Sequence, residues 1–239
     1  MQKPYARLAN LAMLSAVAFV AMLVTRLSFI PAATYLEYEA KDVIIAIAGF
    51  LYGPIEALCS AVVVTALQMV TVSTTGPYGF LMNLFAASSF ACTASLVYSR
   101  RRTIYGAAAG LAAGAVALTA AMLLWNYIIT PLYLSTPRAV VAGMLVPVFL
   151  PFNLIKGSLN AAIAFLLYKP LSNALRAAKL LPPRAAGKAR PKPMPQGAGA
   201  AQSVARAPRP ARLWLMAGAA LVALLCVAAI VALRNGLIG

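Results

Sequence analysis

The chain has 239 residues, of which 63% are hydrophobic and only 10% are charged, and its formal net charge is +16. Soluble domains carry about 25% charged residues, so this chain has too little polar surface to cover a globule in water. A basic excess is typical of nucleic-acid-binding proteins, but here most cations flank apolar segments or lie in the stretch 182–211. That distribution excludes nucleic-acid binding.

Catalytic and metal-binding patterns are missing from the sequence. It contains no histidine, the commonest general base and metal ligand. Its three cysteines, Cys59, Cys92 and Cys226, lie inside apolar runs without metal or disulfide spacing. We therefore expect no catalytic residue, no metal site and no cofactor, and we do not expect an enzyme.

Apolar segments follow one another through the first 180 residues. A helix needs roughly 20 apolar residues to cross the hydrocarbon core. The expected helices cover about 8–27, 43–52, 55–73, 78–98, 104–130 and 140–175. We expect the fifth to stop at Pro131 and the sixth to be interrupted by Pro147 and Pro151. The segment 43–52 is too short to span alone at about 1.5 Å per residue, so it should be tilted, partial or buried against protein.

The C-terminal part has a different composition. Residues 181–211 are rich in Pro, Ala and Arg, which predicts a disordered linker, and a last apolar run covers 213–233. We predict a six-span membrane domain (1–180), a cytoplasmic linker (181–211) and an additional C-terminal transmembrane span (212–239). The fold class is an all-α integral membrane protein.

The basic residues predict the orientation. Cytoplasmic loops carry an excess of Lys and Arg. With the N-terminus in the cytoplasm, the run 100–102 and the linker cations lie inside, and only Arg26, Lys41, Arg138 and Arg234 fall outside. We therefore predict a multi-pass plasma-membrane protein with a cytoplasmic N-terminus.

The strongly polar residues of four helices share the outer level in this orientation. These residues are Gln68, Asn83, Asn126, Thr130, Asn153 and Lys156. A lysine deep in a span costs roughly 2.5–3.5 kcal/mol on insertion scales and usually marks a site. The alternative is an anchor whose amine reaches the interface. For Asn126 and Asn153, the alternative to ligand binding is a structural role in hydrogen bonds between helices. Their common depth with Lys156 favours a ligand pocket.

The first loop brings acids above this level. Glu37, Glu39 and Asp42 belong to a solvated connection. The alternative is that Glu37 and Asp42 cap a helix or pair with Lys41 and Arg26. Asn153, Lys156 and Asn160 follow i, i+3, i+7 spacing and so share one helix face.

Five segments together resemble one family. They are LEYEAKDV (36–43), GFLYGP (49–54), TVSTTG with GFLMN (71–83), WNYIITPLY (125–133) and LPFNLIK (150–156). They are similar, in this order, to the riboflavin-specific substrate-binding (S) components of energy-coupling-factor (ECF) vitamin transporters. The resemblance covers about 5–175, so the linker and the seventh span depart from this six-helix family.

The resemblance implies a ligand, site residues and partners. Riboflavin, carried as substrate, would contact Asn126, Asn153 and Lys156, and Glu39, Met82 and Asn83 would contribute to the pocket. A transmembrane coupling subunit with two ATPase subunits would dock on the Ala12 and Ala16 face of the first helix. That small-xxx-small pair would also let another helix approach closely.

Other interpretations stay open. The same family with another vitamin, such as pantothenate or thiamine, fits the same motifs. A membrane enzyme, a non-transport flavin-binding protein and a scaffold whose basic tail binds anionic lipid belong to other classes.

Overall fold

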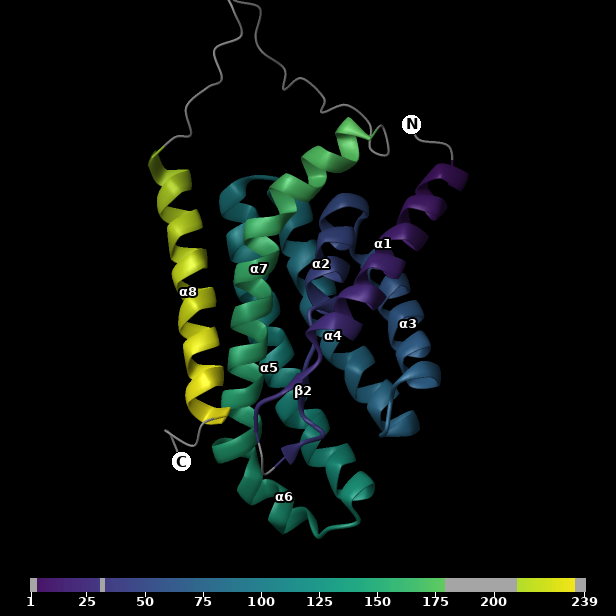
Figure 1. The fold of residues 1–239 in the computed structure, drawn as a ribbon, viewed down its shortest axis with the longest axis vertical. Helices are drawn as coiled ribbons and strands as arrows, with labels where there is room; N and C mark the ends of the chain where they lie inside the picture. The colour runs from purple at the N-terminus through teal and green to yellow at the C-terminus, as the bar shows by residue number, and fades with distance from the viewer. Residues whose placement is uncertain (1–3, 31–32, 179–209, 235–239) are drawn as a thin grey trace, which may run out of the picture.

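A computed structural model describes residues 4–30, 33–178 and 210–234 and shows a helical bundle (Figure 1). Its long helices are α1 (Pro4–Thr25), α3 (Pro54–Thr71), α4 (Gly76–Arg100), α5 (Ile104–Leu134), α7 (Leu150–Ala177) and α8 (Pro210–Arg234). Within the described residues, 5 helices are long and apolar enough to cross a membrane. The predicted all-α membrane class is confirmed, while the count of six spans plus one stays a prediction.

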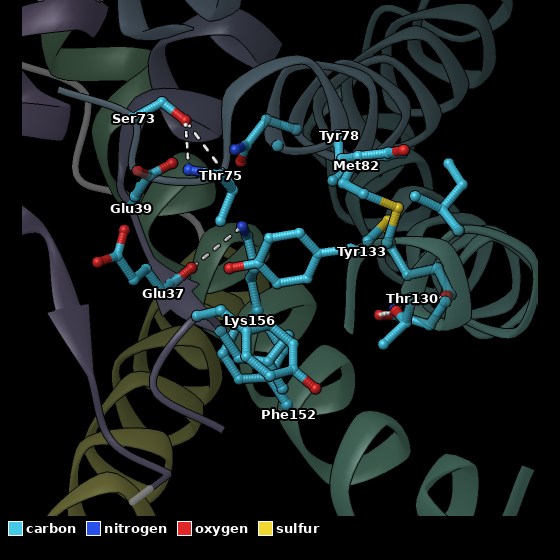
Figure 2. Close-up of a pocket in the computed structure, with 18 of the residues that line it drawn as sticks. Glu37, Glu39, Ser73, Thr75, Tyr78, Met82, Thr130, Tyr133, Phe152 and Lys156 are labelled. Atoms are coloured by element: carbon cyan, nitrogen blue, oxygen red, sulfur yellow. Dashed lines mark hydrogen bonds between the residues drawn. The ribbon is translucent and has the colours of Figure 1, made fainter. Parts of the chain in front are cut away.

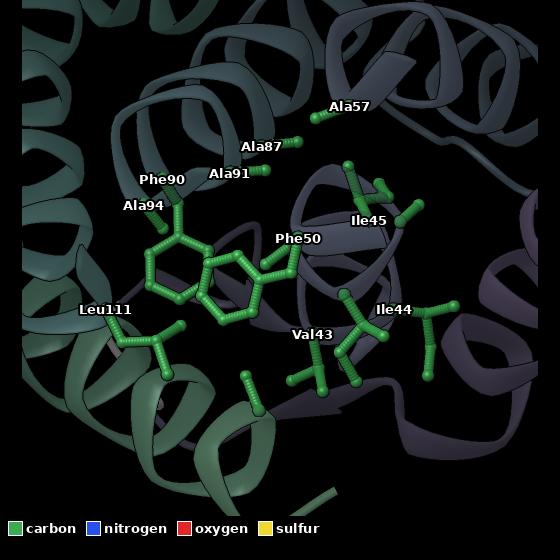
Figure 3. Packing of buried hydrophobic residues seen from close by; sticks show 14 of the residues in the cluster. Val43, Ile44, Ile45, Phe50, Ala57, Ala87, Phe90, Ala91, Ala94 and Leu111 are labelled. Atoms are coloured by element: carbon green, nitrogen blue, oxygen red, sulfur yellow. The ribbon is translucent and has the colours of Figure 1, made fainter. Parts of the chain in front are cut away.

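The short helix α2 (Lys41–Tyr52) lies in the middle of the bundle and packs against α1, α3, α4 and α7. Every residue from Lys41 to Phe50 is buried, as expected for a helix that is apolar on nearly all sides. Figure 3 shows Ile45 and Phe50 beside alanines of α4 and Leu111 of α5. Of the three alternatives predicted for this segment, which were tilted, partial or buried against protein, the structure shows the last.

Helices α4 and α5 approach each other through glycines of α5. A Cβ added at Gly110 would lie 2.6 Å from the backbone oxygen of Ala94, and one at Gly114 would lie 2.7 Å from that of Phe90. These glycines stand four residues apart, the spacing of close helix packing in membranes. The two backbones are therefore in direct contact along this seam.

Gly110→Ala should destabilise the bundle. The new methyl group meets backbone rather than a flexible side chain, so α4 and α5 must separate at a cost of about 1–3 kcal/mol. Gly143→Ala is the matched control, because nothing lies within 4 Å of its Cβ position. Thermal unfolding in detergent compares the two variants, and equal midpoints would contradict the proposed backbone contact.

Helix α5 continues past Pro131 to Leu134, so the prediction that it stops at this proline is wrong. Proline removes one backbone donor and disturbs the carbonyl four residues earlier, but neighbouring helices let membrane helices tolerate it. Pro131 is buried, and the helix ends instead at Leu134, where the next residue, Ser135, has a left-handed φ of 51°.

The last long helical segment of the predicted six-span domain is irregular where its prolines lie. Helix α6 (Arg138–Met144) leads into a π-helical turn, η2 (Leu145–Phe149), before α7 begins. The expected interruption by Pro147 and Pro151 is confirmed. Such π turns occur frequently at functional sites, and the last residue of this one, Phe149, accepts a hydrogen bond from Asn153.

A small hairpin joins α1 to α2. Strands β1 (Leu27–Ser28) and β2 (Glu37–Tyr38) pair antiparallel, with Leu27 opposite Tyr38. Only a loop was predicted here, because two-residue strands leave no alternating pattern long enough to detect.

The structure describes only part of the predicted C-terminal region. The linker prediction, 181–211, lies outside the described residues except for its last two, which begin α8. The predicted span 213–233 falls within α8, which lies beside α7 (Figure 1).

Candidate ligand-binding site

A pocket, shown close up in Figure 2, is lined by elements at the end of the bundle that Figure 1 places opposite to the N-terminus. It holds about 830 Å³ of empty space, part of it open solvent. Its walls come from the hairpin, the turn between α3 and α4, and helices α3, α4, α5 and α7. All six predicted ligand-binding residues line it, namely Glu39, Met82, Asn83, Asn126, Asn153 and Lys156.

Lys156 is buried in the pocket wall. Its Nζ lies 3.9 Å from Oδ2 of Asp42, donates to the backbone oxygen of Glu37 at 3.5 Å and stands 6.0 Å from the centre of the Phe152 ring. Figure 2 shows the hydrogen bond from the amine to Glu37, with Phe152 nearby. The side chain therefore ends inside the protein, which is not the geometry of a lysine anchored at the membrane interface.

A second ion pair is buried behind the pocket wall, where Glu39 lines the pocket and Lys41 does not. Lys41 Nζ contacts a carboxylate oxygen of Glu39 and donates to Oδ1 of Asn83 at 3.1 Å. Gln68 Nε2 donates to the other oxygen of Glu39 at 2.5 Å. Sequence reasoning missed Lys41, because a charged residue at the end of an acidic loop indicates a solvated position.

The buried charges balance. Two cations, Lys41 and Lys156, face two carboxylates, Glu39 and Asp42. At the mouth, Arg26 is paired with Glu37 and also donates to the backbone oxygen of Val72 at 2.8 Å. Each ionised group of this region thus has a counter-charge. The expected pairing of Glu37 with Arg26 is found, whereas Asp42 pairs with Lys156 rather than with Lys41 or Arg26.

The asparagines are fixed by their own helices. Asn126 Nδ2 donates to the backbone oxygen of Met122 at 2.7 Å, and its Oδ1 accepts from Thr130 at 3.0 Å. Asn153 Nδ2 donates to the backbone oxygen of Phe149 at 2.8 Å. These bonds stay within α5 and α7 and do not join helices. Asn160 differs, because its Nδ2 donates across to Oδ2 of Asp42 at 3.2 Å.

Three buried polar atoms of the pocket wall have no hydrogen-bond partner among the described residues. They are the Tyr35 hydroxyl oxygen, Oε1 of Gln68 and Oδ1 of Asn153. An unpaired buried polar group costs about 1–3 kcal/mol. Burial, with a smaller effect of Tyr133, raises the pKa of Tyr35, so its hydroxyl stays a proton donor at neutral pH. A ligand with matching donors and acceptors would recover this cost.

Aromatic rings form the remaining wall. The Tyr133 ring centre lies 5.9 Å from that of Tyr35 and 6.2 Å from that of Tyr78, and Phe152 lies beside Lys156. Such rings offer flat apolar surfaces with polar edges. The sequence signal for them was weak, because single aromatic residues at helix ends are common in membrane proteins.

The fold and the pocket define a polytopic membrane protein that holds a small molecule at one end of its bundle. Comparison with known proteins specifies the family: the model of the ECF transporter substrate-specific component matches residues 6–168. The chain therefore belongs to this family, and the suspected resemblance is confirmed.

Individual relatives agree with this placement. The riboflavin transporter RibU of Staphylococcus aureus is 31% identical over 177 residues, which is 71% of this chain and 92% of that protein. The riboflavin transporter FmnP of Bacillus subtilis is 30% identical over 176 residues, 68% of this chain and 90% of that one. The solved S component of a bacterial ECF transporter has a TM-score of 0.61 at 31% identity and covers 73% of this chain and 99% of that chain.

Proposed function

We propose that this chain captures riboflavin outside the cell and serves as the substrate-binding subunit of an ATP-driven ECF transporter. The observation that supports this proposal most strongly is the pocket. The six ligand-binding residues predicted from the sequence line it together with aromatic rings and paired charges. Two relatives about 30% identical are named riboflavin transporters, which supports the choice of vitamin. The chain itself carries out no chemical step.

The chemistry of the pocket suits riboflavin. The isoalloxazine ring is flat and uncharged, so it fits between apolar and aromatic walls such as Met82 and Tyr133. Asn126, Asn153 and Lys156 supply polar groups for the ring edges and the ribityl hydroxyls. Because the pocket's ionised groups are already paired, an uncharged ligand leaves them undisturbed.

The distribution of cations supports an outward-facing pocket. Arg100 and Arg176 lie at the ends of α4 and α7 nearest the N-terminus, together with Arg7. By the positive-inside rule this end is cytoplasmic, which makes the N-terminus cytoplasmic and opens the pocket to the exterior.

Helix α1 supports a docking surface for the coupling subunit. Ala12 and Ala16 are exposed on α1, where small side chains allow a partner helix to approach closely. Helix α1 packs against α2 and α3, whereas α8 packs against α7, so the extra helix leaves this face open (Figure 1). In this proposal the coupling subunit and two ATPase subunits supply the ATP-driven step.

Purification provides the first test. The purified chain should carry a yellow flavin in stoichiometric amount, visible in its absorption spectrum, and it should quench riboflavin fluorescence in a titration. A colourless protein that does not quench added riboflavin would overturn the assignment. Displacement by pantothenate or thiamine, but not by riboflavin, would transfer the function to that vitamin.

Discrimination against flavin mononucleotide is also expected. Its phosphate would need a free cation, but Arg26, Lys41 and Lys156 are all paired with carboxylates. Breaking the buried pairs of Lys41 or Lys156 leaves an uncompensated charge, at a cost of about 3–5 kcal/mol. The affinity for flavin mononucleotide should therefore fall at least tenfold relative to riboflavin, which is about 1.4 kcal/mol. Competition titrations at fixed salt measure this ratio, and equal affinities would contradict the charge balance.

A further inference from the structure

Helix α8 lies beyond residues 6–168, the part matched by the family model. It contacts the bundle through one defined face. Ala219, Ala223, Cys226 and Ile230 are its residues within the apolar clusters, and they follow i, i+4, i+7, i+11 spacing, which places them on one side of a helix. Its other side exposes Leu221, Leu224 and Leu225. Helix α8 is therefore packed in a specific rotational setting rather than loosely attached.

The outer half of this face joins a buried group that we call the outer cluster. It contains Phe29, Ala33, Leu36, Tyr38, Val141, Phe149, Phe152, Leu159 and Cys226. The first four belong to the segment that joins α1 to α2, and the next four belong to α6, η2 and α7. Cys226 is only 8% exposed, so α8 covers the outer cluster on this side.

The hairpin segment has two faces. Glu37 and Glu39 line the pocket, whereas Tyr38 between them is not part of the pocket wall and is buried in the outer cluster. This alternation follows from the period of two in an extended chain. The same three residues thus form the pocket wall on one side and contact the α8-covered cluster on the other.

We propose that α8 braces the hairpin wall of the pocket, holding residues 33–40 in place through Cys226 and Ile230 and slowing ligand release. Phe152 strengthens the link, because it lines the pocket and also belongs to the outer cluster. Cys226 and Ile230 are positioning residues, because neither lines the pocket. The choice of riboflavin as probe rests on the proposed function, but the brace itself does not.

Paired variants of the full chain test the brace. Cys226→Phe overfills the contact, and Ile230→Ala empties it, so both should loosen α8 from the outer cluster. Leu225→Phe and Val231→Ala are matched controls, because these side chains are 60% and 49% exposed on α8. Two readouts are measured: amide hydrogen exchange of residues 33–40 without ligand, and the riboflavin release rate in a chase experiment.

The brace predicts at least threefold faster exchange and at least threefold faster release for the two contact variants, with both controls unchanged. Unchanged exchange in the contact variants overturns the brace, whether or not riboflavin binds. Faster exchange with unchanged release overturns its role in ligand retention. Faster exchange in a protein that binds no riboflavin supports the brace and instead overturns the proposed ligand.

Discussion

Lys156→Met should weaken riboflavin binding about hundredfold, equivalent to about 2.7 kcal/mol. The variant keeps most of the side-chain volume but removes the amine beside Glu37 and Asp42. A hydrogen bond from a charged donor contributes about 1.5–3 kcal/mol, and the variant can no longer donate one to the ligand. Fluorescence-quenching titration of the purified variant measures the loss.

The same change should also lower stability, which requires a control. Without Lys156, Asn160 is the hydrogen-bond partner of the buried Asp42 carboxylate that remains among the described residues, and removing one member of a buried ion pair costs about 3–5 kcal/mol. The double variant Asp42→Asn, Lys156→Met removes both charges and should recover most of the unfolding midpoint. Its riboflavin affinity should stay low. Recovery of binding together with stability would show that Lys156 only neutralises Asp42.

Glu39→Gln should destabilise the protein by about 3–5 kcal/mol, because it removes the carboxylate that contacts the buried Lys41 amine. Lys41 has a side-chain exposure of 0%, and Asn83 is its other polar contact. The loss should appear as a lower midpoint in denaturant unfolding in detergent. Glu39→Gln combined with Lys41→Met should restore much of it.

Glu37→Gln is the control variant, because it removes a partly exposed ion pair rather than a buried one. Glu37 also forms an ion pair, but its side chain and that of Arg26 are 27% and 25% exposed. Solvent screens such a pair, so its loss should cost no more than about 1 kcal/mol. A cost as large for Glu37 as for Glu39 would show that burial does not set the strength of these pairs.

The sequence was most informative where the depth of a residue in the membrane could be inferred. Twenty-residue apolar runs predict the membrane class, and the unusual depth of Lys156 predicts that its end of the bundle carries a site. Asn126 and Asn153 could be predicted as site residues because their helices place them at the same depth as Lys156. These residues do meet in one pocket. The particular vitamin came from resemblance, since pocket polarity alone fits several small molecules.

Other features could not be predicted, for physical reasons. Lys41 and Asp42 stand at the boundary between an acidic loop and an apolar segment, and only tertiary packing decides that both are buried. Pro131 usually ends a helix, but the surrounding bundle keeps α5 helical there. The spacing of Gly110 and Gly114 was visible, yet small residues are so frequent in this chain that the seam did not stand out.

The burial of α2 on all sides has a consequence for how the protein assembles in the membrane. A helix of 12 residues extends about 18 Å, well short of a hydrocarbon core of about 30 Å. It also begins with Lys41 and Asp42, whose charges disfavour contact with lipid tails. Such a segment cannot be inserted as an independent span. The position of α2 in the bilayer therefore depends on its contacts with α1, α3, α4 and α7, so this helix is held by protein rather than by lipid.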